Sequence, residues 1–383
     1  MKPRGLMIIH NFRPGPVGGA ELQAERLSAQ LVRLGHSMQV LTWLTVPDAP
    51  QEETCANVQI HRVPHRLPYW VKCDNAKTFR YLVLHRGTYD LLHVHMAFGH
   101  AVVAVIVARC FGKKCIIKIA CAGQYGDLCT FSRFERFDKA LRILRLADAM
   151  VAVSSEVEQE LLHYGFQAER IVRIPNGVDA TYFRRTQPFP DYRKTRFVLI
   201  GRRHPQKGID TALHAARKLS EKGLRDQFEI NLYGPDYPEY DYRAMAEELG
   251  VADIVRFFPF EKEILVVYQS SHCLLLPSRG EGLSNTLLEA MAMAMPTIAT
   301  SVSGTQDVID DGKNGILIPP DSPDMLAAAM SKIISRPDWA NLLGKTARQK
   351  VETCFSLESV ACRYSELYTK LHQRYPSLSE HHQ

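Results

Sequence analysis

The sequence predicts an α/β protein built from two doubly wound domains, each a parallel sheet with helices on both faces. Three observations support this. Short apolar, β-branched runs alternate with helical patterns along the chain, as in parallel sheets that are buried on both faces. The 383 residues exceed the size of a typical single domain, which favours two domains of similar size. Turn residues between 175 and 196 separate two series of such runs.

The first series predicts an N-terminal domain over residues 1–187. It opens with an apolar run at 6–9, a Gly-rich turn and a helix from about Gly19 that ends at Gly35. One stripe of that helix carries Ala20, Ala24, Leu27, Leu31 and Leu34. Further strands are expected at 38–41, 91–94, 115–119 and 150–153.

The second series predicts a C-terminal domain over residues 188–355. Its strands are expected at 197–200, 230–232, 254–257, 273–276, 297–299 and 315–318. A last helix follows in residues 356–383, with an apolar face that needs a partner surface from one of the two domains. That face consists of Leu357, Val360, Ala361, Tyr364, Leu367, Tyr368 and Leu371.

Composition places the chain among ordinary globular proteins, with 46% apolar and 23% charged residues. The first apolar run is too short for a signal-peptide core, and the longest, 101–108, cannot span a bilayer. We therefore expect a cytoplasmic protein. The nine cysteines are scattered without a Cys-x-x-Cys pair, which indicates reduced thiols and neither a disulfide framework nor a zinc site.

The net charge of +6 fits a solvated surface, or attraction to anionic lipid, phosphate or nucleic acid. The basic residues cluster most visibly at Arg133, Arg136, Lys139, Arg142 and Arg145. On one helix, steps of three spread them over most of the circumference, and acidic residues are mixed in. We interpret this segment as a solvated helix and expect no nucleic-acid partner.

The strongest local constellation runs from residue 277 to 292. An apolar strand ends at Pro277, a glycine-rich turn follows, and a helix begins near Ser284, a good N-cap residue. The amino end of such a helix suits an anionic ligand. Glu281 is expected at the mouth of the cleft, and Glu289 could accept hydrogen bonds from a ribose diol. The Glu-x7-Glu spacing recurs elsewhere in the chain, so the strand–turn–helix context carries this prediction.

A second constellation is the basic loop 201–208, between the first strand and first helix of the second domain. Arg202 and Lys207 could neutralise the diphosphate leaving group of a sugar nucleotide. The alternative is a solvated basic loop.

In the first domain, Gly18 and Gly19 link the first strand to the first helix, where glycines allow close approach of a phosphate or sugar. The spacing fits neither a dinucleotide fingerprint nor a Walker loop. His93 and His95 end a strand and share one face, an arrangement that is either structural or catalytic.

Together these segments resemble glycosyltransferase family 4, the retaining "glycosyl transferases group 1" of the GT-B fold. The resemblance rests, in order, on 18–21, 93–95, 147–154, 174–179, 201–208 and 281–292. It implies two Rossmann-like domains facing an interdomain cleft, with an acceptor-side N-terminal domain, a nucleotide-sugar-binding C-terminal domain and a last helix that crosses back onto the first domain.

The resemblance also implies the donor site. Arg202 and Lys207 would grip the diphosphate, Glu281 would contact the transferred sugar, and Glu289 would contact the ribose. The backbone of Gly282, Leu283 and Ser284 would line the sugar-phosphate site.

From the first domain, Gly18 and Gly19 would close over the phosphates, and His95 would lie near the reacting centre. The chain departs from many relatives in two places. Residues 120–123 replace a His-Gly pair, and Arg203 replaces an aliphatic residue, which leaves open whether Arg202 or Arg203 meets the phosphate.

By this resemblance the function is retaining transfer of a sugar from a UDP- or GDP-linked donor to a hydroxyl of a glycan, lipid carrier or metabolite, without cofactor or metal. The alternatives are a GT-B epimerase or phosphorylase, or a non-catalytic sugar-nucleotide-binding protein. Peripheral contact with the inner face of the membrane stays open alongside the cytoplasmic location.

Overall fold

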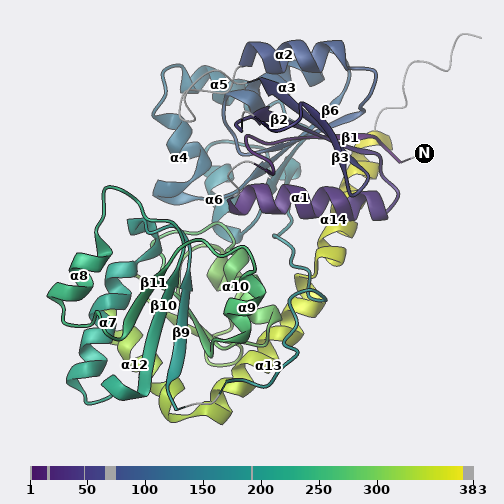
Figure 1. The fold of residues 1–383 in the computed structure, drawn as a ribbon. Helices are drawn as coiled ribbons and strands as arrows, with labels where there is room; N and C mark the ends of the chain where they lie inside the picture. Colours follow the sequence, from purple (N-terminus) through teal and green to yellow (C-terminus); the bar gives the residue numbers. More distant parts are fainter. Residues whose placement is uncertain (1, 15–17, 47, 65–74, 191–192, 374–383) are drawn as a thin grey trace, which may run out of the picture. The chain divides into compact units, whose positions relative to one another are not determined.

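The computed structural model describes residues 2–14, 18–46, 48–64, 75–190 and 193–373 (Figure 1). The chain divides into two compact units, residues 1–177 with 357–383, and residues 178–356. The division therefore follows Gly177, and residues 178–187, which the sequence assigned to the first domain, pack in the second unit. Arg348 holds them there by donating hydrogen bonds to the carbonyls of Ala180 and Phe183.

The first unit contains an eight-stranded sheet in the order β3-β4-β2-β1-β5-β6-β7-β8. All neighbouring strands are parallel except the edge pair β3–β4. The strands are β1 Gly5–Ile8, β2 Met38–Leu44, β3 Glu52–Cys55, β4 Val58–Pro64, β5 Leu91–His95, β6 Lys114–Ile119, β7 Ala149–Ala152 and β8 Ile171–Arg173.

Helices cover both faces of this sheet (Figure 1). On one face α1 packs against α14, and on the other α3 packs between α2 and α5. The helices are α1 Gly19–Arg33, α2 Asn75–Leu84, α3 Gly99–Cys110, α4 Asp127–Ser132, α5 Phe137–Leu144, α6 Ser155–His163 and α14 Leu357–Gln373.

The apolar face expected for the last helix is buried in the first unit. Val360, Ala361, Tyr364, Leu367 and Tyr368 join one core cluster with residues of α1 and the sheet. Polar contacts add to this packing, because His93 Nδ1 lies 2.7 Å from the Tyr368 hydroxyl. The helix therefore completes the core of a unit whose other elements precede residue 178.

The second unit contains a six-stranded, fully parallel sheet in the order β11-β10-β9-β12-β13-β14. Its strands are β9 Thr195–Ile200, β10 Phe228–Tyr233, β11 Val255–Phe258, β12 Cys273–Leu276, β13 Thr297–Thr300 and β14 Ile316–Ile318. Its helices are α7 Ile209–Glu221, α8 Tyr242–Glu248, α9 Ile264–Gln269, α10 Asn285–Ala292, α11 Gly304–Val308, α12 Pro323–Ser335 and α13 Pro337–Cys354.

In each sheet the first strand lies in the interior, and successive strands are added first on one side of it and then on the other. In the second unit, β9 lies between β10 and β12, and the helices that follow β9 and β12 pack on opposite faces (Figure 1). Loops at such a switch point diverge at the carboxyl ends of the strands and leave room for a ligand. The loops after β9 and β12 are the two constellations singled out in the sequence.

The predicted strands and the doubly wound class are confirmed, but the sequence analysis did not predict β3 and β4 at one edge of the first sheet or β8 at the other. The hairpin β3–β4 turns through Ala56 and Asn57, both with positive φ, and β3 is exposed along its whole length. An exposed polar strand has no hydrophobic alternation, so the sequence does not predict it. The eight cysteines of the described residues are free thiols, and Cys73 lies outside them.

Candidate active site

The loops after β9 and β12 are in direct backbone contact. Gly208, with φ of +61°, lies so close to the Pro277 carbonyl that a Cβ atom would stand 1.9 Å from its oxygen. The amide of Arg279 donates to the Gln206 carbonyl at 2.8 Å, and Gln206 Nε2 donates to the Gly280 carbonyl at 2.9 Å. Two segments more than seventy residues apart in sequence thus form one surface at the switch point.

Lys207 and Glu281 form the centre of this surface. Lys207 Nζ lies 2.6 Å from Glu281 Oε1, and the Ser278 hydroxyl donates to the same oxygen at 2.7 Å. The two side chains are 17% and 9% exposed, so the pair is largely desolvated. A lysine held on a carboxylate in this way has one charge neutralised while its other two N–H donors remain available to a ligand.

Arg202 and Arg203 point to different surroundings. Arg203 is 3% exposed, forms an ion pair with Asp236, donates to the Phe258 carbonyl and lies over the ring of Phe257. Arg202 is exposed beside the Lys207 turn. Arg203 therefore serves the packing of the unit, and Arg202 is the arginine that can reach a ligand.

The helix α10 opens as the sequence predicts. Ser284 is its N-cap, and its hydroxyl accepts a hydrogen bond from the Leu287 amide at 3.4 Å. Gly282, Leu283 and Ser284 are all buried. The Gly282 carbonyl accepts from the Gly304 amide at 2.9 Å, so the turn before the helix is anchored to the start of α11.

Glu289 lies in the second turn of α10 and is 5% exposed. Its Oε2 accepts a hydrogen bond from the Tyr268 hydroxyl at 3.0 Å. Tyr268 is itself fully buried and comes from α9. The hydrogen bond from Tyr268 fixes the orientation of the Glu289 carboxylate.

Arg279 joins the two loops, a structural role that the sequence analysis missed. Its guanidinium binds Asp210 at 2.6 Å, Asp321 at 2.7 Å and the Pro205 carbonyl at 2.6 Å. The hydrogen bond that Arg279 donates to the Asp210 carboxylate is the main cause that raises the pKa of Arg279. Arg279 thus links the loop after β12 to the loop after β9. Its acidic partners are distant in sequence, so no local sequence pattern reveals this role.

In the first unit, β5 places His93 and His95 on one face, as predicted. The two rings stack with centroids 4.9 Å apart, and the His95 carbonyl lies 2.9 Å from His100 Nε2. Burial is the main cause that lowers the pKa of His93 to about 3 and of His100 to about 4, and it lowers that of His95 well below the usual value. All three imidazoles are neutral at physiological pH.

Lys118 lies beside His95 on the neighbouring strand β6, in register with it. It is 3% exposed, has no ion pair within the part of the chain that the structure describes, and burial lowers its pKa to about 7. Asp127, at the start of α4, accepts a hydrogen bond from the amide of Ala120, which directly follows β6. Burial is the main cause that raises the pKa of Asp127 to about 7. The carboxyl ends of β5 and β6 thus hold several buried groups that titrate abnormally.

Gly18 and Gly19 stand at the amino end of α1. The Gly18 amide donates to Glu21 Oε2 at 3.0 Å, which caps the helix from within its first turn. Residues 15–17 of the preceding loop lie outside the described residues. The implied role of the two glycines toward a phosphate stays a prediction.

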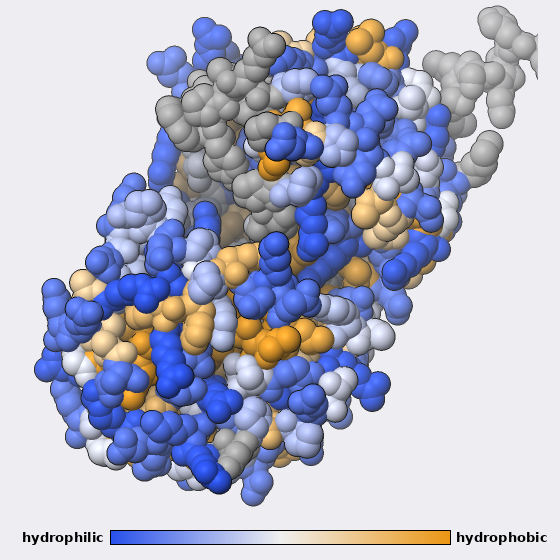
Figure 2. Space-filling model, in the orientation of Figure 1, coloured by the Kyte–Doolittle hydropathy of each residue, from blue (hydrophilic) through white to orange (hydrophobic). Residues whose placement is uncertain are grey.

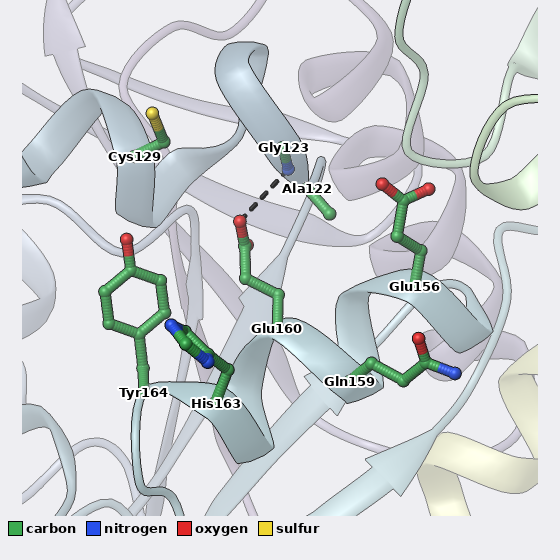
Figure 3. Close-up of a pocket in the computed structure, with 8 residues that line it drawn as sticks. All are labelled: Ala122, Gly123, Cys129, Glu156, Gln159, Glu160, His163 and Tyr164. Carbon is green, nitrogen blue, oxygen red and sulfur yellow. Dashed lines mark hydrogen bonds between the residues drawn. The ribbon is translucent and has the colours of Figure 1, made fainter.

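A separate hollow of about 420 Å³ lies in the first unit between the turn after β6 and helix α6 (Figure 3). Polar and apolar atoms both line it, and the lining residues are Ala122, Gly123, Cys129, Glu156, Gln159, Glu160, His163 and Tyr164. Glu160 Oε1 accepts from the Gly123 amide at 3.0 Å, while its other oxygen has no partner among the described residues. Burial is the main cause that raises the pKa of Glu160.

Within the described residues, no three His, Cys, Asp or Glu side chains gather as a metal site would need. Within those same residues we also find no helix whose length and apolar character would let it span a lipid bilayer.

Comparisons with known proteins agree with this geometry. Residues 17–182 match the family described as Glycosyltransferase Family 4, and residues 183–350 match the one described as Glycosyl transferases group 1. The fold and these matches define a GT-B glycosyltransferase that uses nucleotide-sugar donors. The chain belongs to glycosyltransferase family 4.

Two relatives and two solved structures illustrate the match. The chain is 26% identical to D-inositol 3-phosphate glycosyltransferase of Frankia alni, over 87% of this chain and 90% of that one. It is 24% identical to MMP alpha-(1->4)-mannosyltransferase of Mycolicibacterium hassiacum, over 92% and 95%. Sucrose-phosphate synthase of Thermosynechococcus elongatus superposes with a TM-score of 0.81 at 21% identity, over 98% and 100%. Anabaena HepE in complex with UDP-glucose gives 0.77 at 17% identity, over 96% and 100%.

Proposed function

We propose that the chain transfers a sugar, with retention of anomeric configuration, from a UDP- or GDP-linked donor to a hydroxyl of a glycan, lipid carrier or metabolite in the cytoplasm. The observation that carries the proposal is the Lys207–Glu281 pair at the switch point, with Arg202 exposed beside it. A glycosyl transfer develops negative charge on the departing diphosphate, and preorganised cations offset that charge.

The family membership and the surroundings of the donor-site residues support the following roles. Arg202 and Lys207 hold the diphosphate, and Glu281 turns from Lys207 toward the hydroxyls of the transferred sugar. Glu289, oriented by Tyr268, accepts from the ribose. The backbone of 282–284 lines the sugar-phosphate site.

In this proposal the first unit binds the acceptor. His95, neutral because it is buried, lies near the reacting centre in this proposal, and Gly18 and Gly19 contact the donor phosphates. The hollow beside α6 offers carboxylate, amide and imidazole groups, which suit an acceptor rich in hydroxyls (Figure 3).

A donor screen tests the first step. Thermal unfolding is measured with UDP, GDP and other nucleoside diphosphates, since a ligand that binds the native state raises Tm. We expect UDP or GDP to stabilise the second-unit transition. No stabilisation by any nucleoside diphosphate would contradict the donor site.

Radiolabelled UDP- and GDP-sugars, incubated with and without candidate acceptors, test the reaction. Transfer should require an acceptor, and NMR of the product should show the anomeric configuration of the donor. Release of an isomerised sugar nucleotide without acceptor would identify an epimerase. Donor binding without turnover on any acceptor would identify a non-catalytic binding protein.

The hollow is tested by Gln159→Ala, which changes its lining without touching the donor site. An acceptor bound there should show a raised KM at unchanged nucleotide affinity. An unchanged acceptor KM would place the acceptor elsewhere in the first unit.

A further inference from the structure

The positive charge of the protein is concentrated in one segment of the first unit. Residues 75–146, all of them described, contain twelve Lys and Arg against four Asp and Glu, a net charge of +8. The whole chain has a net charge of +6, so the rest of the molecule carries −2. The basic character seen in the composition is therefore a local property of α2, α3, α5 and their connections.

The cations of this segment project from one layer of helices. Arg80, Arg86, Arg109, Lys139 and Arg142 are exposed on or just after α2, α3 and α5. These helices lie side by side with α3 in the middle (Figure 1). The predicted single helix across residues 133–145 is wrong, because α4 ends at Ser132 and α5 begins only at Phe137. The cations there all remain exposed instead of spreading around one helix.

None of these five cations has an acidic partner within the described residues. Other surface cations do form ion pairs, as Arg217, Lys218 and Arg225 of the second unit show. The two nearby acidic residues that do form ion pairs, Asp90 and Asp148, hold Arg4 and Lys114. Glu135 and Asp138 are also exposed in this segment, but its net charge of +8 leaves the layer with a surplus of positive charge that ion pairs do not neutralise.

Large apolar side chains are exposed on the same layer. Phe79, Leu84, Ile106, Phe111 and Leu146 are between 37% and 63% exposed. They interleave with the cations, as shown by Arg86, whose guanidinium lies 5.5 Å from the Phe111 ring centroid. Figure 2 shows such apolar residues among hydrophilic ones at the α2 end of the first unit. We call these five apolar residues and the five cations the basic-apolar face.

We propose that the basic-apolar face binds the surface of a lipid bilayer that contains anionic headgroups. Anionic headgroups offset the unpaired cations, and the interleaved apolar side chains enter the boundary between headgroups and acyl chains. Cations in the last turn of a helix also offset its dipole, which accounts for Arg109 and Arg142 alone. The dipole gives no reason for exposed Leu84, Phe111 and Leu146 beside them.

A nucleic acid fits this face less well. Its phosphates would pair with the cations, but bases bind proteins by stacking on aromatic rings or by hydrogen bonds. Three of the five apolar side chains are aliphatic, and an aliphatic chain gains from leaving water for lipid. The proposal does not depend on the transferase reaction, because it uses no residue of the donor site.

The test is co-sedimentation of the full chain with vesicles of phosphatidylcholine, with and without phosphatidylglycerol. The protein should pellet with the anionic vesicles and stay in solution with the neutral ones. Arg109→Glu/Arg142→Glu should weaken this binding by about tenfold or more, since each cation near an anionic surface contributes on the order of a fivefold change. Phe111→Ser/Leu146→Ser should remove the binding that survives at high salt.

A matched control reverses the same number of charges in the second unit. Lys222 and Lys345 are exposed and lie far in sequence from the face. Lys222→Glu/Lys345→Glu should pellet like the unchanged protein, and an equal loss would overturn the proposal. Circular dichroism checks that each variant is folded. If Arg109→Glu/Arg142→Glu does not fold, Phe111→Ser/Leu146→Ser still tests the proposal.

A second experiment measures binding of the same proteins to short duplex DNA. Binding to DNA that is tighter than to the anionic vesicles and unchanged by Phe111→Ser/Leu146→Ser would overturn the proposal in favour of a polyanion site. Equal pelleting with neutral and anionic vesicles, or none with either, would also overturn it.

Discussion

The pair formed by Lys207 and Glu281 gives the sharpest prediction. Lys207→Ala removes a charge-assisted hydrogen bond of 2.6 Å between side chains that are 17% and 9% exposed. Glu281 then keeps the Ser278 hydroxyl as donor but loses its counter-charge. Loss of such a bond costs about 2 kcal/mol, which corresponds to a fall in Tm of roughly 4–8 °C for a unit of this size.

The same substitution should weaken nucleoside-diphosphate binding. Loss of one lysine contact to the diphosphate, again about 2 kcal/mol, raises Kd about thirtyfold. Isothermal titration calorimetry measures this change. Glu281→Gln separates the two functions of the pair, because it frees Lys207. We expect it to leave nucleotide affinity at least as strong while transfer falls.

Lys218→Ala is the matched control, since Lys218 forms an ion pair of 2.7 Å with Asp324 on the exposed surface of the same unit. Exposed pairs contribute about 0–1 kcal/mol, so Tm and nucleotide affinity should both stay close to their original values. Nucleotide affinity that is unchanged in Lys207→Ala would refute the reasoning, even if Tm falls as expected.

The two adjacent arginines should have different effects. Arg202→Ala should weaken nucleotide binding at unchanged Tm, whereas Arg203→Ala should lower Tm because it removes a buried guanidinium and leaves the Phe258 carbonyl without this donor. Calorimetry and thermal unfolding read out both, and the opposite pattern would reverse their roles. Gly208→Ala should destabilise the second unit by at least about 1–3 kcal/mol, because φ is positive and the new Cβ meets the Pro277 carbonyl; a Tm equal to that of the unchanged protein would contradict the contact. Burial lowers the pKa of His93 to about 3, of His100 to about 4 and of His95 well below its usual value. Below about pH 6.5 the unfolded chain therefore binds protons that the folded chain does not, and the protein loses stability as pH falls through this window. Asp127 acts in the opposite direction, because its raised pKa lets the folded state hold a proton that the unfolded chain releases. Three histidines outnumber the one aspartate, so the first unit should lose stability as pH falls from 6 to 5, and urea midpoints that do not fall in that range would refute it.

The sequence predicted the parallel strands because buried strands carry continuous apolar runs, and it predicted the last helix because its seven apolar residues share one face. It also predicted that the loops after β9 and β12 belong to one donor site, because each loop lies between a strand and the following helix. It could not predict β3, whose residues are all exposed, or the part that Arg279 plays, whose partners Asp210 and Asp321 are joined to it only by the fold.

The choice between Arg202 and Arg203 also required coordinates. Both follow β9, and adjacent residues at the end of a strand point to opposite sides. Which side is buried depends on Asp236 and Phe258, which follow β10 and end β11. Local sequence carries no record of those neighbours.

The place of α14 in the first unit sets the order in which a newly made chain can fold. The buried face of α14, with Tyr364 and Tyr368, completes a core whose remaining members come before residue 178. During translation, the ribosome must add residues 178–356 before this helix emerges, a delay of about ten to forty seconds at bacterial and eukaryotic elongation rates. During that time the apolar surface beside α1 that α14 later covers stays exposed in the nascent first unit. The second unit can therefore fold first, and the core of the first unit is completed last.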